Sequence, residues 1–149
     1  MSRLIRCSPP FTFGENGEAK HADGFDLGTT VGYTEGDYSL TLTDMSKVFG
    51  PAYDAMGNSC IKLGTSKVVG CFSFTVADDV NKVVIRVAAY KKNTTKINVN
   101  GVDYAVETLS NDGEHTEIVV ETTANKTVVF ATVEGGVRAM IDSIAYYAN

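Results

Sequence analysis

The sequence predicts an all-β protein: an antiparallel β-sandwich of jelly-roll topology. Three observations support this prediction. Short segments rich in β-branched and aromatic residues follow one another through the second half of the chain, mostly bounded by Gly, Asn or Asp. Turn signals lie between these segments. No long segment of helical periodicity interrupts them, which favours a sandwich or barrel over a mixed fold.

Length and composition are those of an ordinary globular chain. The 149 residues correspond to one domain and can bury a sizeable core. Hydrophobic residues make up 44% of the chain and charged residues 21%, which argues against disorder. We therefore expect a single β-sandwich domain over residues 1–149.

The first half is the less regular part of the predicted sandwich. Glycine-rich segments there indicate long loops joined by short strands, and "YSLTLT" from Tyr38 is the clearest strand. Residues 44–57 are compatible with one or two short helical turns. Thr43 would be the N-cap, Pro51 suits a first helical position, and Gly57 suits a C-terminal stop.

The second half provides most of the predicted strands. In "CFSFTV", Phe72, Phe74 and Val76 alternate with Cys71, Ser73 and Thr75, so one face is apolar. The strands expected after it are "KVVIRVAAY", "TKINV", "VDYAV", "TEIVVET", "KTVVFATV" and "MIDSIAYY".

The dipeptide Asn100-Gly101 predicts a two-residue hairpin turn, because both positions of a type I′ turn need positive φ. This turn would pair Val99 with Val102, and Ile97 with Tyr104. Tyr104 would then share a face with Val99, Val102 and Val106 and belong to the core.

Several of these segments together carry a resemblance to a known family. "GPAYDAMGNSCIKLG", Gly70 before "CFSFTV", the run "VNKVVIRVAAYKKNTTKINVNG" and the closing "RAMIDSIAYY" resemble jelly-roll modules of secreted bacterial proteins. Those modules are similar to the galactose-binding-like fold and include carbohydrate-binding modules. The resemblance covers roughly residues 50–147. It implies an extracellular module of a larger protein, and it transfers no functional residue.

Charge argues against nucleic acid as a partner. The net charge is −5, whereas nucleic-acid binding needs a basic field. The basic residues that concentrate in one span are expected to protect a sheet edge or loop; they are Lys82, Arg86, Lys91, Lys92 and Lys96.

The chain shows no membrane-spanning or signal segment. No apolar run is long enough for a membrane span. The start, "MSRLIRCSPP", lacks an apolar signal region. Beside the extracellular interpretation, a cytoplasmic or virion location therefore stays open.

A catalytic site and a structural zinc site are not expected. His21 and His115 lie in turn-like segments, where we expect them on the surface, and no nucleophile elbow is present. Without a CxxC motif, structural zinc is not expected. The oxygen-rich segments "ENGE" and "DGFD" are compatible with a structural calcium ion, and no other cofactor is expected.

The cysteines number three: Cys7, Cys60 and Cys71. Cys60 and Cys71 are each expected to face away from their strand's apolar side. They could pair if their strands were neighbours, and two reduced thiols are the favoured alternative.

Sugar recognition needs an aromatic surface with polar groups beside it, and side-chain parity indicates where one could form. Tyr90 falls on the side opposite Ile85 and Val87, together with Arg86, so its ring is expected to be exposed. Tyr33 and Tyr53 lie in loop-like segments and Arg138 at a loop tip. The candidate ligand-binding residues are Arg86, Tyr90, Lys91, Asn93, Tyr33, Tyr53 and Arg138.

The predicted function is therefore that of a non-catalytic carbohydrate-binding module, not an enzyme, recognising a polysaccharide or glycan through a shallow tyrosine and polar surface. The alternative is a structural or protein-interaction module, such as a decoration domain of a virion or an adhesion domain of a cell surface. A protein partner in a multi-domain assembly is compatible with both.

Overall fold

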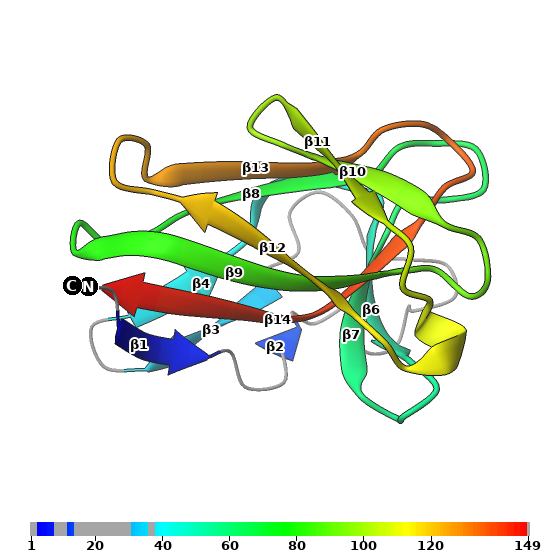
Figure 1. The fold of residues 1–149 in the computed structure, drawn as a ribbon, viewed down its shortest axis with the longest axis horizontal. Helices are drawn as coiled ribbons and strands as arrows, with labels where there is room; N and C mark the ends of the chain where they lie inside the picture. Colours follow the sequence, from blue (N-terminus) through cyan, green and yellow to red (C-terminus); the bar gives the residue numbers. More distant parts are fainter. Residues whose placement is uncertain (1–2, 8–11, 14–30, 36–37, 149) are drawn as a thin grey trace.

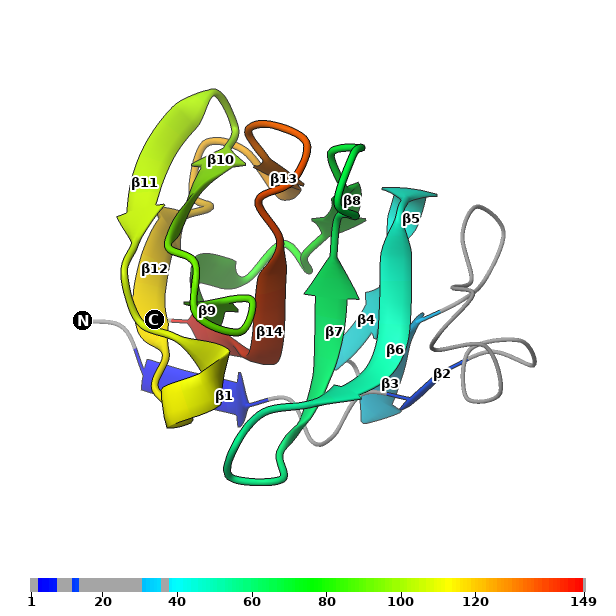
Figure 2. The same ribbon diagram turned by 90° about the vertical axis from the view of Figure 1, so that its right-hand side faces the viewer.

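A computed structural model describes residues 3–7, 12–13, 31–35 and 38–148, and it confirms the all-β antiparallel sandwich. Two sheets face each other with the core between them (Figure 1, Figure 2). The six-stranded sheet comprises β1 (Arg3–Cys7), β6 (Val48–Tyr53), β7 (Ser59–Leu63), β9 (Val80–Ala89), β12 (Thr116–Glu121) and β14 (Ala139–Ala148). The five-stranded sheet comprises β5 (Thr43–Ser46), β8 (Cys71–Thr75), β10 (Thr95–Val99), β11 (Val102–Val106) and β13 (Thr127–Thr132).

The chain crosses between the two sheets at almost every connection, which gives the predicted jelly-roll topology. From β7 onward, the strands alternate between the sheets except at the β10–β11 hairpin. The strand orders β12-β9-β14-β7-β6 and β11-β10-β13-β8-β5 run in the same sense (Figure 2). Strand neighbours are thus mostly distant in sequence, as in other Greek-key sandwiches.

A third, small sheet adds to one end of the core. It comprises β2 (Thr12–Phe13), β3 (Val31–Glu35) and β4 (Tyr38–Thr41). Leu40 is buried in the main core, and the half-buried Tyr38 packs against it while its hydroxyl contacts the Asp79 carboxylate at 2.6 Å. The hydroxyl of buried Tyr146 donates a hydrogen bond to the Ser39 carbonyl at 3.1 Å. Tyr38 therefore combines apolar packing with a polar contact at the rim.

Alternating side chains from both sheets fill the core. Phe72 stacks on Phe130 with ring centroids 5.2 Å apart, at the centre of the five-stranded sheet. Opposite them lie the apolar faces of β7, β9, β12 and β14, each fully or nearly fully buried. The buried side chains from these four strands include Ile61, Leu63, Val83, Ile85, Val87, Ile118, Val120, Ile141, Ile144 and Tyr146.

The Asn100-Gly101 hairpin is confirmed, including its register. Val99 pairs with Val102 and Ile97 with Tyr104, and both turn residues have positive φ. Tyr104 packs against the core from the side and is half-buried, but Val102 is 54% exposed, so its expected place in the core is wrong. β11 is an edge strand of the five-stranded sheet, and β12 is an edge strand of the six-stranded sheet. At this edge the tip of the hairpin extends past the six-stranded sheet, which would otherwise cover Val102.

The helical turns expected within residues 44–57 are not there: β5 and β6 occupy this segment. Thr43 pairs with Ser73 in β8 rather than capping a helix, and Pro51 sits in β6 where its register with β7 shifts. Proline is tolerated at such an irregularity because no ladder donor is needed there. The helical turn that the described residues contain is η2 (Ser110–Asp112), and no described helix has the length and apolarity to cross a bilayer.

Gly70 tests how tightly the start of β8 is packed. A Cβ at Gly70 would collide with the backbone of Gly64 and lie 2.9 Å from Cδ1 of Leu63. We expect Gly70→Ala to lower the free energy of unfolding by about 3 kcal/mol, because backbone atoms must move. Gly101→Ala, where nothing lies within 4 Å but φ is +91°, should cost about 1–2 kcal/mol. Urea denaturation of both variants measures this difference, and equal losses would contradict the packing explanation.

Candidate functional site

The outer face of the six-stranded sheet, which points away from the sandwich interior, carries the chemically distinctive side chains. Parity places Arg86, Ala88 and Tyr90 on this face of β9 and its continuation. The register continues the face sideways, because Met140 of β14 lies between Ala88 and Lys62. The surface reaches β6, where Phe49 pairs with Lys62.

Three cations surround the ring of Tyr90 at one end of this face. The Arg138 guanidinium carbon lies 4.4 Å from the ring centroid, and the Nζ atoms of Lys62 and Lys91 each lie 5.3 Å from it. Lys62 also lies 4.5 Å from the centroid of the Phe49 ring. We call Tyr90, Lys62, Lys91, Arg138 and Phe49 the Tyr90 surface. Such distances are those of cation–π contacts.

Hydrogen bonds from the backbone hold the Tyr90 surface in place. The Tyr90 N–H donates to the Arg138 carbonyl at 2.9 Å, which joins the ends of β9 and β14. The Lys91 N–H donates to Oγ of Ser110 at 2.7 Å, and Lys91 itself has a φ of 61°. The segment after β9 is therefore tied to two other segments and is not a free loop.

Positive charge gathers at the Tyr90 surface. Burial, followed by the charges of Arg138 and Lys91, lowers the pKa of Lys62. Within the described part of the chain, no carboxylate forms an ion pair with Lys62, Lys91 or Arg138. The three cations repel one another, and no carboxylate of the described residues pairs with them. They therefore create a local positive potential, although the net charge of the chain is −5.

The structure brings three of the predicted ligand-binding residues together: Tyr90, Lys91 and Arg138. The Tyr90 ring is half-buried against Ala52, Cys60 and Met140, so the expectation of an exposed ring is wrong. These small and apolar neighbours come from β6, β7 and β14, and no local signal in the sequence places them under the ring.

The other candidates lie elsewhere. Arg86 turns to Asp142, with Nε 3.7 Å from Oδ1. Asn93 is exposed, without a hydrogen bond among the described contacts. Tyr53 is 64% exposed at the end of β6, and Tyr33 lies in β3 opposite Leu40, so both belong to strands and not to loops. Lys62 and Phe49 were missed, although the alternation in "SCIKL" already places Lys62 opposite Ile61 and Leu63.

A buried polar cluster lies further along the same face, and it corrects the expectation of a surface histidine. The His115 side chain is fully buried (0% exposed), with Nε2 3.8 Å from Oδ2 of Asp54 and Nδ1 3.7 Å from Oδ2 of Asp142. Neither ring nitrogen has a hydrogen-bond partner. His115 precedes the edge strand β12, and the turn before it folds over the sheet, which local sequence does not reveal.

The environment sets the protonation of this cluster. Burial raises the pKa of Asp54, but hydrogen bonds from Asn58 and Met56 together with His115 outweigh it and hold the pKa below its usual value. Burial, aided by Arg86, lowers the pKa of His115 despite the two carboxylates beside it. Burial and the charges of Asp54 and Asp142 raise the pKa of Cys60 to about 12. The cluster therefore holds a carboxylate, a neutral imidazole and a thiol.

Cys60 and Cys71 are free thiols in different sheets, on β7 and β8. Both face away from the core side of their strand as expected. Cys60 is nonetheless fully buried, because other segments cover this part of the outer face. The calcium-compatible residues 15–18 and 23–26, together with His21, lie outside the described residues.

A shallow cleft of about 470 Å³ lies beside the β10–β11 hairpin, and its lining includes Thr94 and Val137, which are close in sequence to Lys91 and Arg138. Its lining is polar and includes Lys96, Asp103, Glu107 and Glu134, with no aromatic side chain among the described residues. The cleft can accept hydrogen bonds from hydroxyl groups but offers no ring for stacking.

Comparison with known proteins gives matches at the level of structure. No model of a protein family matches the chain, and no curated protein sequence does. Among solved structures, the CBM36-1 domain of a multidomain xylanase from the hindgut metagenome of Trinervitermes trinervoides is 14% identical, with 69% of this chain and 90% of that chain covered and a TM-score of 0.38.

Two further solved structures are similar. CsCBM6-3 from Clostridium stercorarium in complex with cellobiose is 16% identical, covering 71% of this chain and 89% of that chain at a TM-score of 0.40. The catalytic domain of Agl-KA is 13% identical, covering 96% of this chain but 28% of that chain at a TM-score of 0.38.

Ser110 offers a test of how the Tyr90 surface is held. Ser110→Ala leaves the Lys91 N–H without its partner, so we expect the free energy of unfolding to fall by about 1–2 kcal/mol. The exposed Ser66, with no side-chain hydrogen bond among the described contacts, provides the matched control, and Ser66→Ala should stay within about 0.5 kcal/mol. Urea denaturation measures the free energy of unfolding of both variants. Equal values would contradict the proposal that the Ser110 hydroxyl holds the segment after β9.

Proposed function

We propose that this chain is a non-catalytic carbohydrate-binding module and that its ligands are acidic glycans bound at the Tyr90 surface. The observation that carries the proposal is the group of three cations around one aromatic ring without an ion-pair partner among the described residues. Carboxylate or sulfate groups of a polysaccharide would supply the missing counter-charge. Arginine and lysine are the side chains that recognise such groups.

The shape of the surface supports an extended ligand over a small enclosed one. The surface lies on a sheet face and at the ends of β9 and β14, so a long chain can pass across it. The half-buried Tyr90 ring supplies apolar area beside the charges, and Phe49, which is 7% exposed, packs beneath Lys62. Sites on rigid elements lose little conformational entropy on binding.

The proposal predicts discrimination between two forms of one polymer. We expect affinity electrophoresis to show retardation by polygalacturonate and none by the same polymer with its carboxylates methyl-esterified. Added salt should weaken the retardation, because part of the attraction is screened. No retardation by any acidic or neutral polysaccharide, or by any glycan of an array, would remove carbohydrate binding as the function.

Substitutions at the surface locate the binding. We expect Arg138→Gln to weaken binding of polygalacturonate by about 5- to 30-fold, the effect of losing one charge-assisted contact. The matched control is Lys92→Gln, which removes the same charge next to Lys91 but at an exposed residue without a ring contact among the described residues. Control affinity should change by less than about twofold. An equal loss of affinity in Arg138→Gln and Lys92→Gln would indicate attraction by diffuse surface charge. A loss of affinity in Asp103→Asn alone would place the ligand in the cleft beside the β10–β11 hairpin.

A structural or protein-interaction module is the second candidate, and one observation favours it. At the β6–β7 turn, Tyr53 and Met56 are 64% and 72% exposed. Large apolar side chains exposed together often belong to contact surfaces.

Self-association tests this candidate. It predicts a dimer at increasing concentration in size-exclusion chromatography with light scattering, and a Tyr53→Ser/Met56→Ser variant should remain monomeric at the same concentrations. If Tyr53 and Met56 do not contact another copy of the chain, this variant and the wild-type chain should have the same molar mass at every concentration. A wild-type chain that is monomeric throughout would remove self-assembly as its role.

A further inference from the structure

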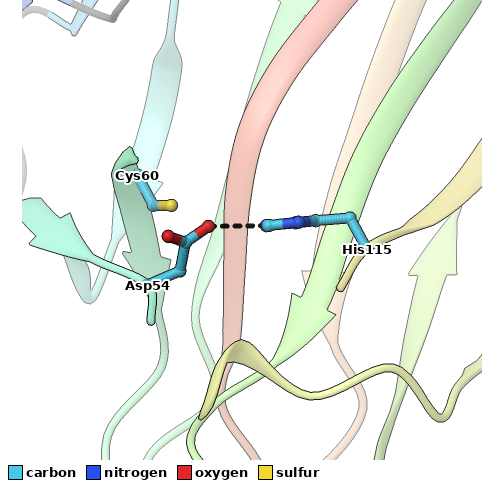
Figure 3. Close-up of side chains that lie close together, drawn as sticks. All are labelled: Asp54, Cys60 and His115. Atoms are coloured by element: carbon cyan, nitrogen blue, oxygen red, sulfur yellow. Dashed lines mark ion pairs between the residues drawn. The ribbon is translucent and has the colours of Figure 1, made fainter. Parts of the chain in front are cut away.

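The buried cluster on the outer face contains three different side chains that can bind a metal ion. Oxygen of Asp54, sulfur of Cys60 and nitrogen of His115 all lie within 4.8 Å of one another. Figure 3 shows the thiol and the carboxylate on one side, both directed toward the imidazole ring opposite them. The three residues come from the end of β6, from β7 and from the turn before β12.

We propose that Asp54, Cys60 and His115 bind a zinc ion, and that Asp142 orients the His115 ring for this purpose. Nothing in the Tyr90 surface or in the sheet packing requires a histidine at this position. The site lies beneath the surface of the molecule, and metal binding there can be measured independently of the glycan binding proposed above.

The distances fit zinc with small adjustments. Zinc in proteins is tetrahedral with bonds of roughly 2.0–2.3 Å, so its ligand atoms lie about 3.3–3.8 Å from one another. Nε2 of His115 and Oδ2 of Asp54 are 3.8 Å apart, and no pair among the three ligand atoms exceeds 4.8 Å. Three protein ligands leave a fourth position, which a water molecule fills in many zinc sites.

The arrangement of His115 is the strongest argument. Both ring nitrogens are buried and without a hydrogen-bond partner, a costly state for a polar side chain. Nδ1 faces the Asp142 carboxylate at 3.7 Å while Nε2 faces Asp54. A histidine that binds a metal through one nitrogen commonly donates its other N–H to a carboxylate. The metal and Asp142 together therefore account for both nitrogens.

The supporting contacts fix the ligands before a metal binds. Oδ1 of Asp54 accepts the N–H groups of Met56 and Asn58 at 2.9 and 3.0 Å, and Oδ2, which faces His115, accepts the Asn58 side-chain amide at 3.1 Å. Asp142 lies where the register of β14 with β9 shifts, between Ile141 and Ser143. Such bulges redirect side chains next to functional sites.

The chemistry of the ligands selects zinc over calcium or magnesium. Calcium and magnesium take oxygen ligands, whereas thiolate and imidazole favour zinc. The Asp54 carboxylate and a Cys60 thiolate would together neutralise a divalent ion, and Arg86 faces the charge of Asp142. A neutral assembly is what a buried position requires. Zinc binds an imidazole nitrogen that carries no proton and a sulfur in the thiolate form, so its binding releases the proton of Cys60 to solvent.

Cobalt binding in a single-cysteine background tests the proposal. In a Cys7→Ser/Cys71→Ser variant, Cys60 is the sole cysteine that the sequence retains. After chelator treatment and addition of Co²⁺, we expect a thiolate-to-cobalt charge-transfer band with a stoichiometry of one per chain, and zinc should displace it. His115→Gln in the same background should abolish the band. Absence of the band in a folded parent variant would overturn the proposal.

Thermal unfolding provides a readout that does not depend on cobalt. Zinc at 100 times its Kd should raise the midpoint of the parent variant by about 5–10 °C. The variant with His115→Gln should show no rise. If that variant does not fold, Asp54→Asn replaces it. Its amide oxygen can keep the hydrogen bonds from the Met56 and Asn58 N–H groups, whereas the bond from the Asn58 side chain and the anionic ligand are lost. An equal rise in the parent and in a folded ligand variant would overturn the site.

Discussion

The outer face of the six-stranded sheet depends on the hydrogen bonds of one buried residue, Ser110. Its carbonyl accepts the Ala55 N–H at 2.9 Å and the Gly113 N–H at 3.1 Å, and its hydroxyl accepts the Lys91 N–H at 2.7 Å. Three segments distant in sequence, the β6–β7 turn, the segment after β9 and the turn η2, therefore meet at this residue. Figure 1 shows η2 beside the β6–β7 turn at one end of the sandwich. This junction adds to the other contacts that hold the segment before β12 against the sheet, among them the hydrogen bond from the Ala89 N–H to the Thr108 carbonyl at 2.8 Å and the packing of Leu109 on the core.

That cover explains why part of β9 and part of β14 are buried on both faces. An antiparallel sheet that faces solvent on one side alternates buried and exposed residues. β9 departs from this pattern where Ala88 is as fully buried as its neighbours Val87 and Ala89, and β14 departs from it at Met140. Both departures lie under the same region of the outer face. The covered part holds His115, Cys60 and Asp54, whereas the Tyr90 surface lies at its margin, where cations reach solvent.

Local signals in the sequence specify much of the sandwich but little of the site. The Asn100-Gly101 turn was predictable to the register, because its conformation is set by two residues. Parity placed Tyr90 and Cys60 on the correct faces. Parity cannot say what covers a face, so the burial of Cys60 and His115 could not be predicted. The strands β5 and β6 were missed for a related reason: their pairing with β8 and β7 outweighs local preferences that suggested helical turns.

Cys60 links the two parts of this face. Its side chain packs with Ala52 and Met140, and the Tyr90 ring rests on this small apolar group. The sulfur also points toward Asp54 and His115 on the other side (Figure 3). Cysteine suits both contacts of this residue, because its small side chain packs like an apolar residue and its sulfur can bind a metal ion. The position of the Tyr90 ring therefore depends on the same residue that completes the buried cluster, so the ordering of one part contributes to the ordering of the other.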